Sequence, residues 1–130
     1  MQGLHLTADL YGCRCDAALL DDAQAIALLC CTLTDDCDLS VMADRWVTFP
    51  GLGGQRGGVT GVVLLAESHV AIHTWPELGN VTLDIYVCNF SGDNSAKAEQ
   101  LMQNLLQAYQ ADRVLRKRLL RGDLTCDGPS

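Results

Sequence analysis

Three runs of β-branched and other apolar residues follow one another through the middle of the chain, with only a few residues between them. They span Val59–Ala66, Val70–Trp75 and Val81–Cys88. Runs of this length and composition predict strands. Connections this short join antiparallel neighbours, because a parallel crossover needs a dozen residues or more. The centre of the chain therefore predicts an antiparallel sheet.

The flanking segments add strands to this sheet. Leu4–Leu10 alternates apolar and polar residues, which is typical of a half-buried strand. Leu39–Phe49 and Val114–Leu120 are two further candidates. Between the second strand and the central ones, Pro50–Gly58 holds five glycines in nine residues, which indicates a mobile loop.

Two helices are predicted, one before and one after the central strands in the sequence. Asp21 and Asp22 precede the apolar stretch Ala23–Cys31, as expected at a helix N-terminus. From Asn94 onward, apolar residues recur at helical spacing and form a stripe that must pack on something. The members of this stripe are Ala98, Leu101, Met102, Leu105, Leu106 and Tyr109. We therefore expect an α+β two-layer sandwich, with a mainly antiparallel sheet and two helices on one face.

The length of 130 residues and the absence of a linker predict one domain over residues 1–130, ending in a frayed tail at 122–130. The net charge of -7 argues against a nucleic-acid partner, because phosphate recognition depends on clustered Lys and Arg. The one dense basic run, Arg113–Arg121, alternates with Leu and is better interpreted as a solvated strand face.

The chain has no basic-then-apolar leader at its start and no stretch near the ~20 apolar residues that span a bilayer, so we expect neither secretion nor a membrane. Seven cysteines in such a chain indicate free thiols in a reducing cytoplasm. Cys13 and Cys15 form a C-x-C pair, but no second pair has ligand spacing, so no metal site is expected.

Polar and reactive residues crowd the junction of two apolar strands in Ala66–Glu77, which reads Ala-Glu-Ser-His-Val-Ala-Ile-His-Thr-Trp-Pro-Glu. Stability alone would not favour such residues there. This segment, with Cys88 downstream, resembles the processing and catalytic core of the small prokaryotic S-adenosylmethionine decarboxylases. The likeness extends to the opening His5–Tyr11, to the Val59–Ala66 run and to the closing basic strand.

The resemblance implies a zymogen that cleaves itself between Glu67 and Ser68. The Ser68 hydroxyl would attack the Glu67 carbonyl, and the amide would become an ester. His73 would then remove the Cα proton of Ser68, so that the ester eliminates. The products would be a β chain, residues 1–67, and an α chain, residues 68–130. The α chain would begin with a pyruvoyl group derived from Ser68, which is the implied cofactor.

The same resemblance assigns the later chemistry. The pyruvoyl carbonyl would form a Schiff base with the substrate amine and accept electrons as carbon dioxide leaves. Cys88 would donate the proton that replaces it. Thr60 stands where the family usually has a serine that helps processing, and it keeps the hydroxyl. Outside this motif, Ser68 would be interpreted as a turn residue, and His73 and Cys88 as core residues.

Three residues are candidates for binding the substrate. Trp75 would stack on adenine, Phe49 would lie on the opposite side, and the carboxylate of Glu77 would attract a cation. The chain departs from the family pattern here. The glycine-rich stretch after Phe49 is several residues longer than usual, and Leu78 stands where the family has an aromatic residue.

The implied activity is decarboxylation of S-adenosylmethionine, which yields an aminopropyl donor for polyamine and spermidine synthesis. The resemblance also implies a homodimer of processed protomers. Two alternatives stay open at this point. One is a pyruvoyl-dependent decarboxylase of ornithine or arginine, favoured by the acidic composition and the altered loop. The other is an unprocessed homologue that acts as a regulatory or binding subunit.

Overall fold

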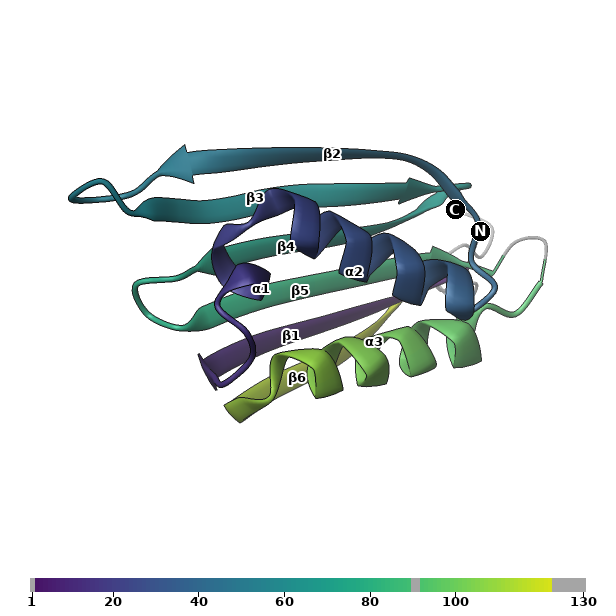
Figure 1. Cartoon of the computed structure of the whole chain (residues 1–130). Helices are drawn as coiled ribbons and strands as arrows, with labels where there is room; N and C mark the ends of the chain where they lie inside the picture. Colours follow the sequence, from purple (N-terminus) through teal and green to yellow (C-terminus); the bar gives the residue numbers. More distant parts are fainter. Residues whose placement is uncertain (1, 90–91, 123–130) are drawn as a thin grey trace.

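The computed structural model describes residues 2–89 and 92–122, and the predicted tail from residue 123 onward lies outside them. The described residues form six strands and three helices (Figure 1). In chain order these are β1 (Gly3–Cys13), α1 (Ala18–Asp21), α2 (Ala23–Asp36), β2 (Val41–Pro50), β3 (Arg56–Leu65), β4 (Ser68–Trp75), β5 (Asn80–Cys88), α3 (Ser95–Tyr109) and β6 (Ala111–Arg121).

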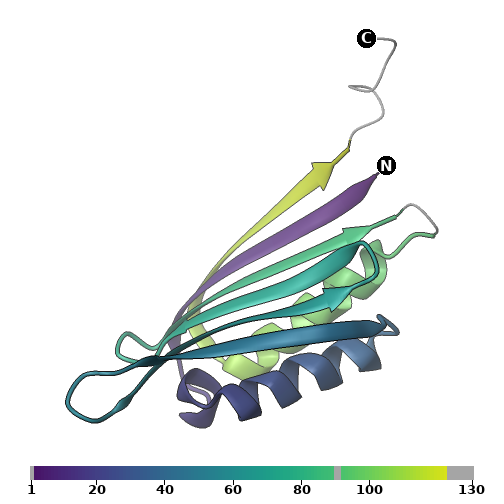
Figure 2. The same ribbon diagram turned by 90° about the horizontal axis from the view of Figure 1, so that it is seen from above.

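The six strands form one antiparallel sheet in the order β2-β3-β4-β5-β1-β6. The three central strands β3, β4 and β5 are neighbours in the sheet. β1 pairs with β5 on one side and with β6 on the other. All six predicted strands are present, and the helices pack on one face of the sheet (Figure 2). The prediction of an α+β two-layer sandwich is confirmed.

Both predicted helices form, for the predicted physical reasons. Asp22 caps α2, because its carboxylate accepts hydrogen bonds from the backbone N–H groups of Gln24 at 3.0 Å and Ala25 at 3.4 Å. The stripe of α3 faces the sheet, and all of its predicted members except the partly buried Leu106 are completely buried. The four-residue helix α1 was not predicted.

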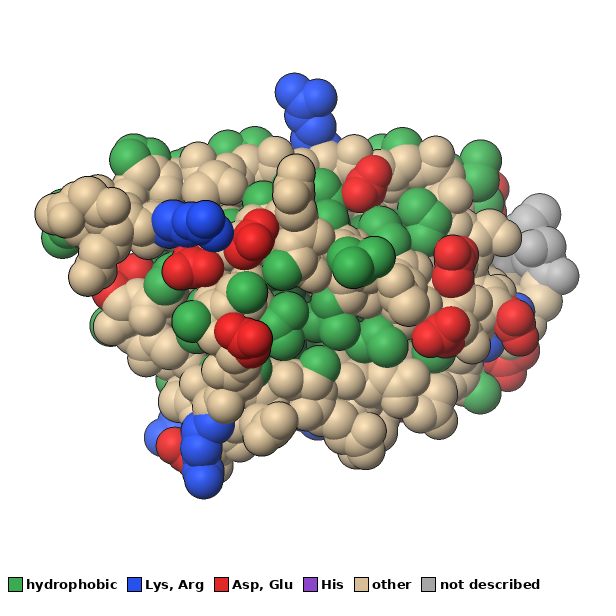
Figure 3. All heavy atoms as spheres, viewed as in Figure 1, with side chains coloured by type: hydrophobic (Ala, Val, Ile, Leu, Met, Phe, Trp, Pro, Cys, Tyr) green, Lys and Arg blue, Asp and Glu red, His purple; other side chains and the backbone are tan. Residues whose placement is uncertain are grey.

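The two faces of the sheet differ in their cover. Along β1, Leu4, Leu6, Ala8 and Leu10 point toward the helices and are buried. The alternate residues point to the opposite side, which no helix of the described residues covers (Figure 2). We call this side the open face. Figure 3 shows the helical side, where Asp and Glu side chains outnumber Lys and Arg.

The basic run lies on β6, at the edge of the sheet, where most side chains are exposed as predicted. Because residues of a strand alternate between faces, the run divides in two. Arg116 and Arg118 point toward α3, and each lies 3.1 Å from a carboxylate oxygen of Glu99. Arg113 and Arg121 belong to the open face, over the rings of Tyr11 and Tyr86.

Candidate active site

The predicted cleavage site lies in the tight turn between β3 and β4. Leu65 and Ser68 are paired across this turn, so Ala66 and Glu67 are its two central residues. Glu67 has a φ of 57°, in the left-handed region that non-glycine residues rarely adopt. A backbone held in this region stores strain of about 1–3 kcal/mol. The bond expected to break therefore follows a strained residue.

Cys88 is the last residue of β5 and lies beside Ser68. Its backbone N–H donates a hydrogen bond of 3.0 Å to the Ser68 hydroxyl oxygen. Its carbonyl accepts one of 2.9 Å from the side chain of Asn94, which precedes α3. Cys88 is buried, with 8% of the residue's surface exposed. The structure thus brings together Ser68 and Cys88, two of the three residues assigned to the chemistry.

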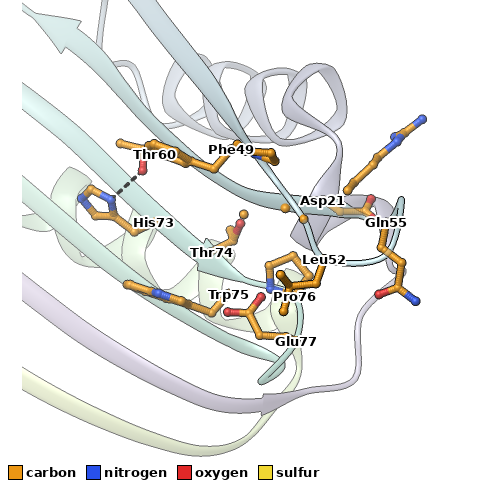
Figure 4. A pocket seen from close by; sticks show the side chains of 15 residues that line it. Asp21, Phe49, Leu52, Gln55, Thr60, His73, Thr74, Trp75, Pro76 and Glu77 are labelled. Atoms are coloured by element: carbon orange, nitrogen blue, oxygen red, sulfur yellow. Dashed lines mark hydrogen bonds between the residues drawn. The ribbon is translucent and has the colours of Figure 1, made fainter.

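His73 and Thr60 form a second pair, near the other end of β4. The register of β3 and β4 sets the two residues opposite each other. The Thr60 hydroxyl and His73 Nδ1 are 3.0 Å apart, within hydrogen-bonding distance (Figure 4). A hydroxyl at this position orients the imidazole ring and leaves its Nε2 atom available for proton transfer. The His73 side chain is exposed.

A cavity of about 980 Å³ opens beside this second pair. Its walls include Thr60 and His73 as well as all three predicted substrate-binding residues, Phe49, Trp75 and Glu77. Phe49 comes from β2 and Trp75 from β4, and their rings lie on opposite sides of the cavity (Figure 4). Phe49 is 50% exposed and Trp75 is 38% exposed. Such an arrangement suits a flat aromatic group between two rings.

The glycine-rich loop does not displace Phe49 from the cavity, because its ends are tightly closed. A Cβ atom on Gly57 would lie 2.1 Å from the carbonyl oxygen of Phe49, and one on Gly51 would lie 2.2 Å from that of Gln55. Only glycine fits at two such close approaches of the backbone. The loop therefore extends the wall of the cavity outward while Phe49 stays in place.

The structure does not bring His73 to Ser68 within one chain. The two residues are five positions apart on the extended strand β4. At ~3.4 Å per residue, their Cα atoms are about 17 Å apart. Proton transfer requires contact, directly or through one water molecule. A single chain thus holds two half-sites, Ser68 with Cys88 and His73 with Thr60.

Two residues near the cavity were missed in the sequence. Asp21 lies in the cavity wall (Figure 4), where it adds a second carboxylate to Glu77. It was interpreted only as part of a helix N-terminus. Thr74 also lines the cavity and is buried. Its hydroxyl lies 2.6 Å from the carbonyl oxygen of Leu20 and accepts from the N–H of Val59 at 2.8 Å, which ties α1 to the strands.

The cysteines of the described residues are free thiols. Burial raises the pKa of Cys13 to about 11 and that of Cys30 to about 12, so both stay protonated at neutral pH. Within the described parts of the chain, no three His, Cys, Asp or Glu side chains are grouped to hold a metal ion. None of the helices described here is long and apolar enough to cross a membrane.

The chain is similar to known proteins over most of its length. The "S-adenosylmethionine decarboxylase proenzyme" of Picrophilus torridus is 35% identical over 120 residues, which cover 92% of this chain and 84% of the relative. The proenzyme of the same name from Aquifex aeolicus is 40% identical over 112 residues, or 86% and 75% of the two chains. These relatives give no support to an ornithine or arginine decarboxylase or to an unprocessed subunit.

Comparison of the fold with solved structures also finds an adenosylmethionine decarboxylase. The crystal structure of the adenosylmethionine decarboxylase from Aquifex aeolicus superposes with a TM-score of 0.79 at 36% sequence identity. The superposition covers 93% of this chain and 91% of that one. The family model described as S-adenosylmethionine decarboxylase matches residues 4–122. The chain therefore belongs to the S-adenosylmethionine decarboxylase family.

Proposed function

We propose that this chain is a zymogen that cleaves itself at Glu67–Ser68 and then decarboxylates S-adenosylmethionine. The observation that carries this proposal is the contact between Ser68 and Cys88 beside a strained turn. It sets the expected nucleophile of processing next to the backbone of Cys88, the residue expected to donate the proton in decarboxylation. Family membership supports the substrate, and the product would be an aminopropyl donor for polyamine synthesis.

Cleavage proceeds in three steps: attack by Ser68, removal of a proton by a base, and hydrolysis. The Ser68 oxygen attacks the Glu67 carbonyl carbon, and the amide becomes an ester. The strain at Glu67 favours this step because breaking the peptide link releases it. A base then removes the Cα proton of Ser68, and the ester C–O bond breaks to free the Glu67 carboxylate. Water releases ammonia from the residue that remains, which leaves a pyruvoyl group.

The residues around position 68 fit such a self-derived group. The hydroxyl it needs is present, and the neighbouring N–H of Cys88 is a fixed donor pointing at the side chain of residue 68. The pyruvoyl group supplies an electron sink for the loss of carbon dioxide. The thiol of Cys88 carries one hydrogen that it can transfer as a proton. A thiol at this place delivers that proton to the substrate carbon.

The active enzyme is, in this proposal, a homodimer. His73 is too far from Ser68 to act within its own chain, so a second copy supplies it. Large apolar side chains on the open face support an interface there, among them Val47, Leu64, Leu115 and Leu119, each about half exposed. In a twofold dimer, His73 of each chain approaches Ser68 of the other, so both sites are completed together.

The cavity then serves as the nucleoside site. Phe49 and Trp75 hold the adenine between them, and Glu77 and Asp21 favour a ligand that carries positive charge, as a sulfonium does. In the proposed dimer the cavity comes from the chain that supplies His73, and residue 68 from its partner. A reducing cytoplasm is the compartment we propose, because the described cysteines are unpaired.

The direct test is release of carbon dioxide from carboxyl-labelled S-adenosylmethionine by the purified protein. We expect turnover by the parent chain and none by Ser68→Ala, in which the pyruvoyl group cannot form. Ornithine and arginine serve as control substrates and should release none. A protein that cleaves itself but leaves S-adenosylmethionine intact would contradict the proposed substrate.

A further inference from the structure

Three aromatic rings gather on the open face, one residue from Ser68 along β4 and two residues from Cys88 along β5. They belong to His69 of β4, Tyr86 of β5 and His5 of β1, which are paired in that order across the three strands. The ring centroids of His69 and Tyr86 are 5.7 Å apart, and that of His5 lies 6.0 Å from Tyr86 and 6.4 Å from His69. We call these residues the ring cluster.

His5 is held from two sides. Arg121 donates to its Nδ1 atom at 3.2 Å, so that atom is an acceptor. The Nε2 atom must then carry the hydrogen, which it donates to the carboxylate of Asp84. The guanidinium of Arg121 also lies over the ring of Tyr86, 5.7 Å from its centroid. These contacts fix both the orientation of His5 and one side of the Tyr86 ring.

The Tyr86 ring in turn leans over Gly3. A Cβ atom on Gly3 would lie 2.6 Å from the Tyr86 hydroxyl oxygen and 2.7 Å from a ring carbon, so the ring uses the space that glycine leaves. Gly3 is paired with Cys88, and side chains two apart on a strand share a face. The thiol of Cys88 thus belongs to the uncovered side of the sheet, yet its residue is only 8% exposed.

We propose that His5 is a positioning residue that keeps the Tyr86 ring over Gly3 and thereby shields and places the Cys88 thiol. The inference rests on the proposed function, in which Cys88 donates the proton. A shielded thiol delivers its proton to the substrate carbon rather than exchanging it with bulk water. Asp84 and Arg121 act through His5, by fixing its ring.

The test measures alkylation of Cys88 by iodoacetamide, resolved by peptide mass. It uses the uncleaved Ser68→Ala chain, so it does not depend on processing or turnover. Adding His5→Ala should raise the alkylation rate of Cys88 by about tenfold, because the cover opens. His5→Gln keeps an N–H donor at the position of Nε2 and should stay near the parent rate. The buried Cys30 reports general unfolding and should not change.

Gly3→Ala provides a second, independent variant for this experiment. Its methyl group displaces the Tyr86 ring, while residue 5 remains His. It should expose Cys88 as His5→Ala does. Tyr11→Ala is the matched control, because Tyr11 also lies on β1 beneath an arginine, Arg113, but near the far end of the strand. Sedimentation of each variant ensures that chains of equal oligomeric state are compared.

The outcomes separate this proposal from the proposed function. An unchanged rate at Cys88 in both His5→Ala and Gly3→Ala would overturn the positioning role, even if the parent chain cleaves itself and decarboxylates. Equal acceleration at Cys88 and Cys30 would overturn it as well, because the effect would then be loss of the fold. Failure of the parent chain to process would leave this result unaffected.

Discussion

The Ser68 hydroxyl accepts a hydrogen bond of 3.0 Å from the backbone N–H of Cys88, twenty residues further along the chain. The antiparallel pairing of β4 with β5 creates this contact, because the start of one strand lies beside the end of the other. The pairing of β3 with β4 sets Thr60 opposite His73 in the same way. Two sheet registers therefore determine both half-sites.

Exchange between chains is the first prediction. Ser68→Ala and His73→Ala should each stay uncleaved alone. When the two are co-expressed, the His73→Ala chain retains Ser68 and meets an intact His73 from its partner. Random pairing places about half of these chains in mixed dimers, so about half should cleave. Mass spectrometry of the mixture gives the fraction, and no cleavage there would mean that His73 does not act across an interface.

The second prediction separates processing from decarboxylation. Cys88→Ala should still cleave itself, since its backbone N–H remains, but kcat should fall by about a hundredfold or more without the proton donor. Intact mass follows the first property, and carbon dioxide release follows the second. Cys31→Ala is the control, because Cys31 is a partly buried cysteine on α2 that packs against the core. An unimpaired kcat in Cys88→Ala would show that another group donates the proton.

Thr60 supplies the third prediction. Thr60→Val removes the hydroxyl that lies 3.0 Å from His73 and should slow cleavage about tenfold, while Thr60→Ser should preserve the rate. Thr82 faces His73 from the other neighbouring strand. Thr82→Val is thus the matched control and should process normally. The time course of cleavage after purification distinguishes these variants, and equal rates for Thr60→Val and Thr82→Val would refute a role for the Thr60 hydroxyl.

Strain at the cleavage site gives the fourth prediction. In the uncleaved Ser68→Ala chain, Glu67→Gly should raise the free energy of unfolding by about 0.5–1 kcal/mol, because glycine adopts a φ of 57° freely. Ala66→Gly, at the other central position of the turn, relieves no positive φ and should lower it. Urea titration measures both changes. Destabilisation by Glu67→Gly as large as that by Ala66→Gly would argue against strain at Glu67.

Much of the fold was predictable, because it follows from local patterns. The alternation in β1, the acidic cap at Asp22 and the stripe of α3 each depend on residues close in sequence. The helix α1 was not predictable from four residues, and with it Asp21 escaped notice as part of the cavity. Its place depends on the long-range contact between Thr74 and Leu20.

The candidate site was predictable in its residues but not in its geometry. The motif identified Ser68, His73 and Cys88 through family resemblance, and that resemblance assigned His73 as the base that acts on Ser68. On an extended strand, five residues of spacing hold Ser68 and His73 far apart, because each residue advances the chain by ~3.4 Å. The pairing of His5 with Asp84 gave no local signal, since the residues are 79 positions apart.

Intact mass spectrometry of the freshly purified protein, beside the Ser68→Ala control, shows whether the chain cleaves itself at Glu67–Ser68. We predict two fragments in the parent chain, divided after Glu67. The C-terminal fragment should be lighter by one ammonia than a chain beginning with serine, and the control should stay whole. A single full-length mass after long incubation, identical in form to the control, would contradict self-processing and the pyruvoyl group that follows from it.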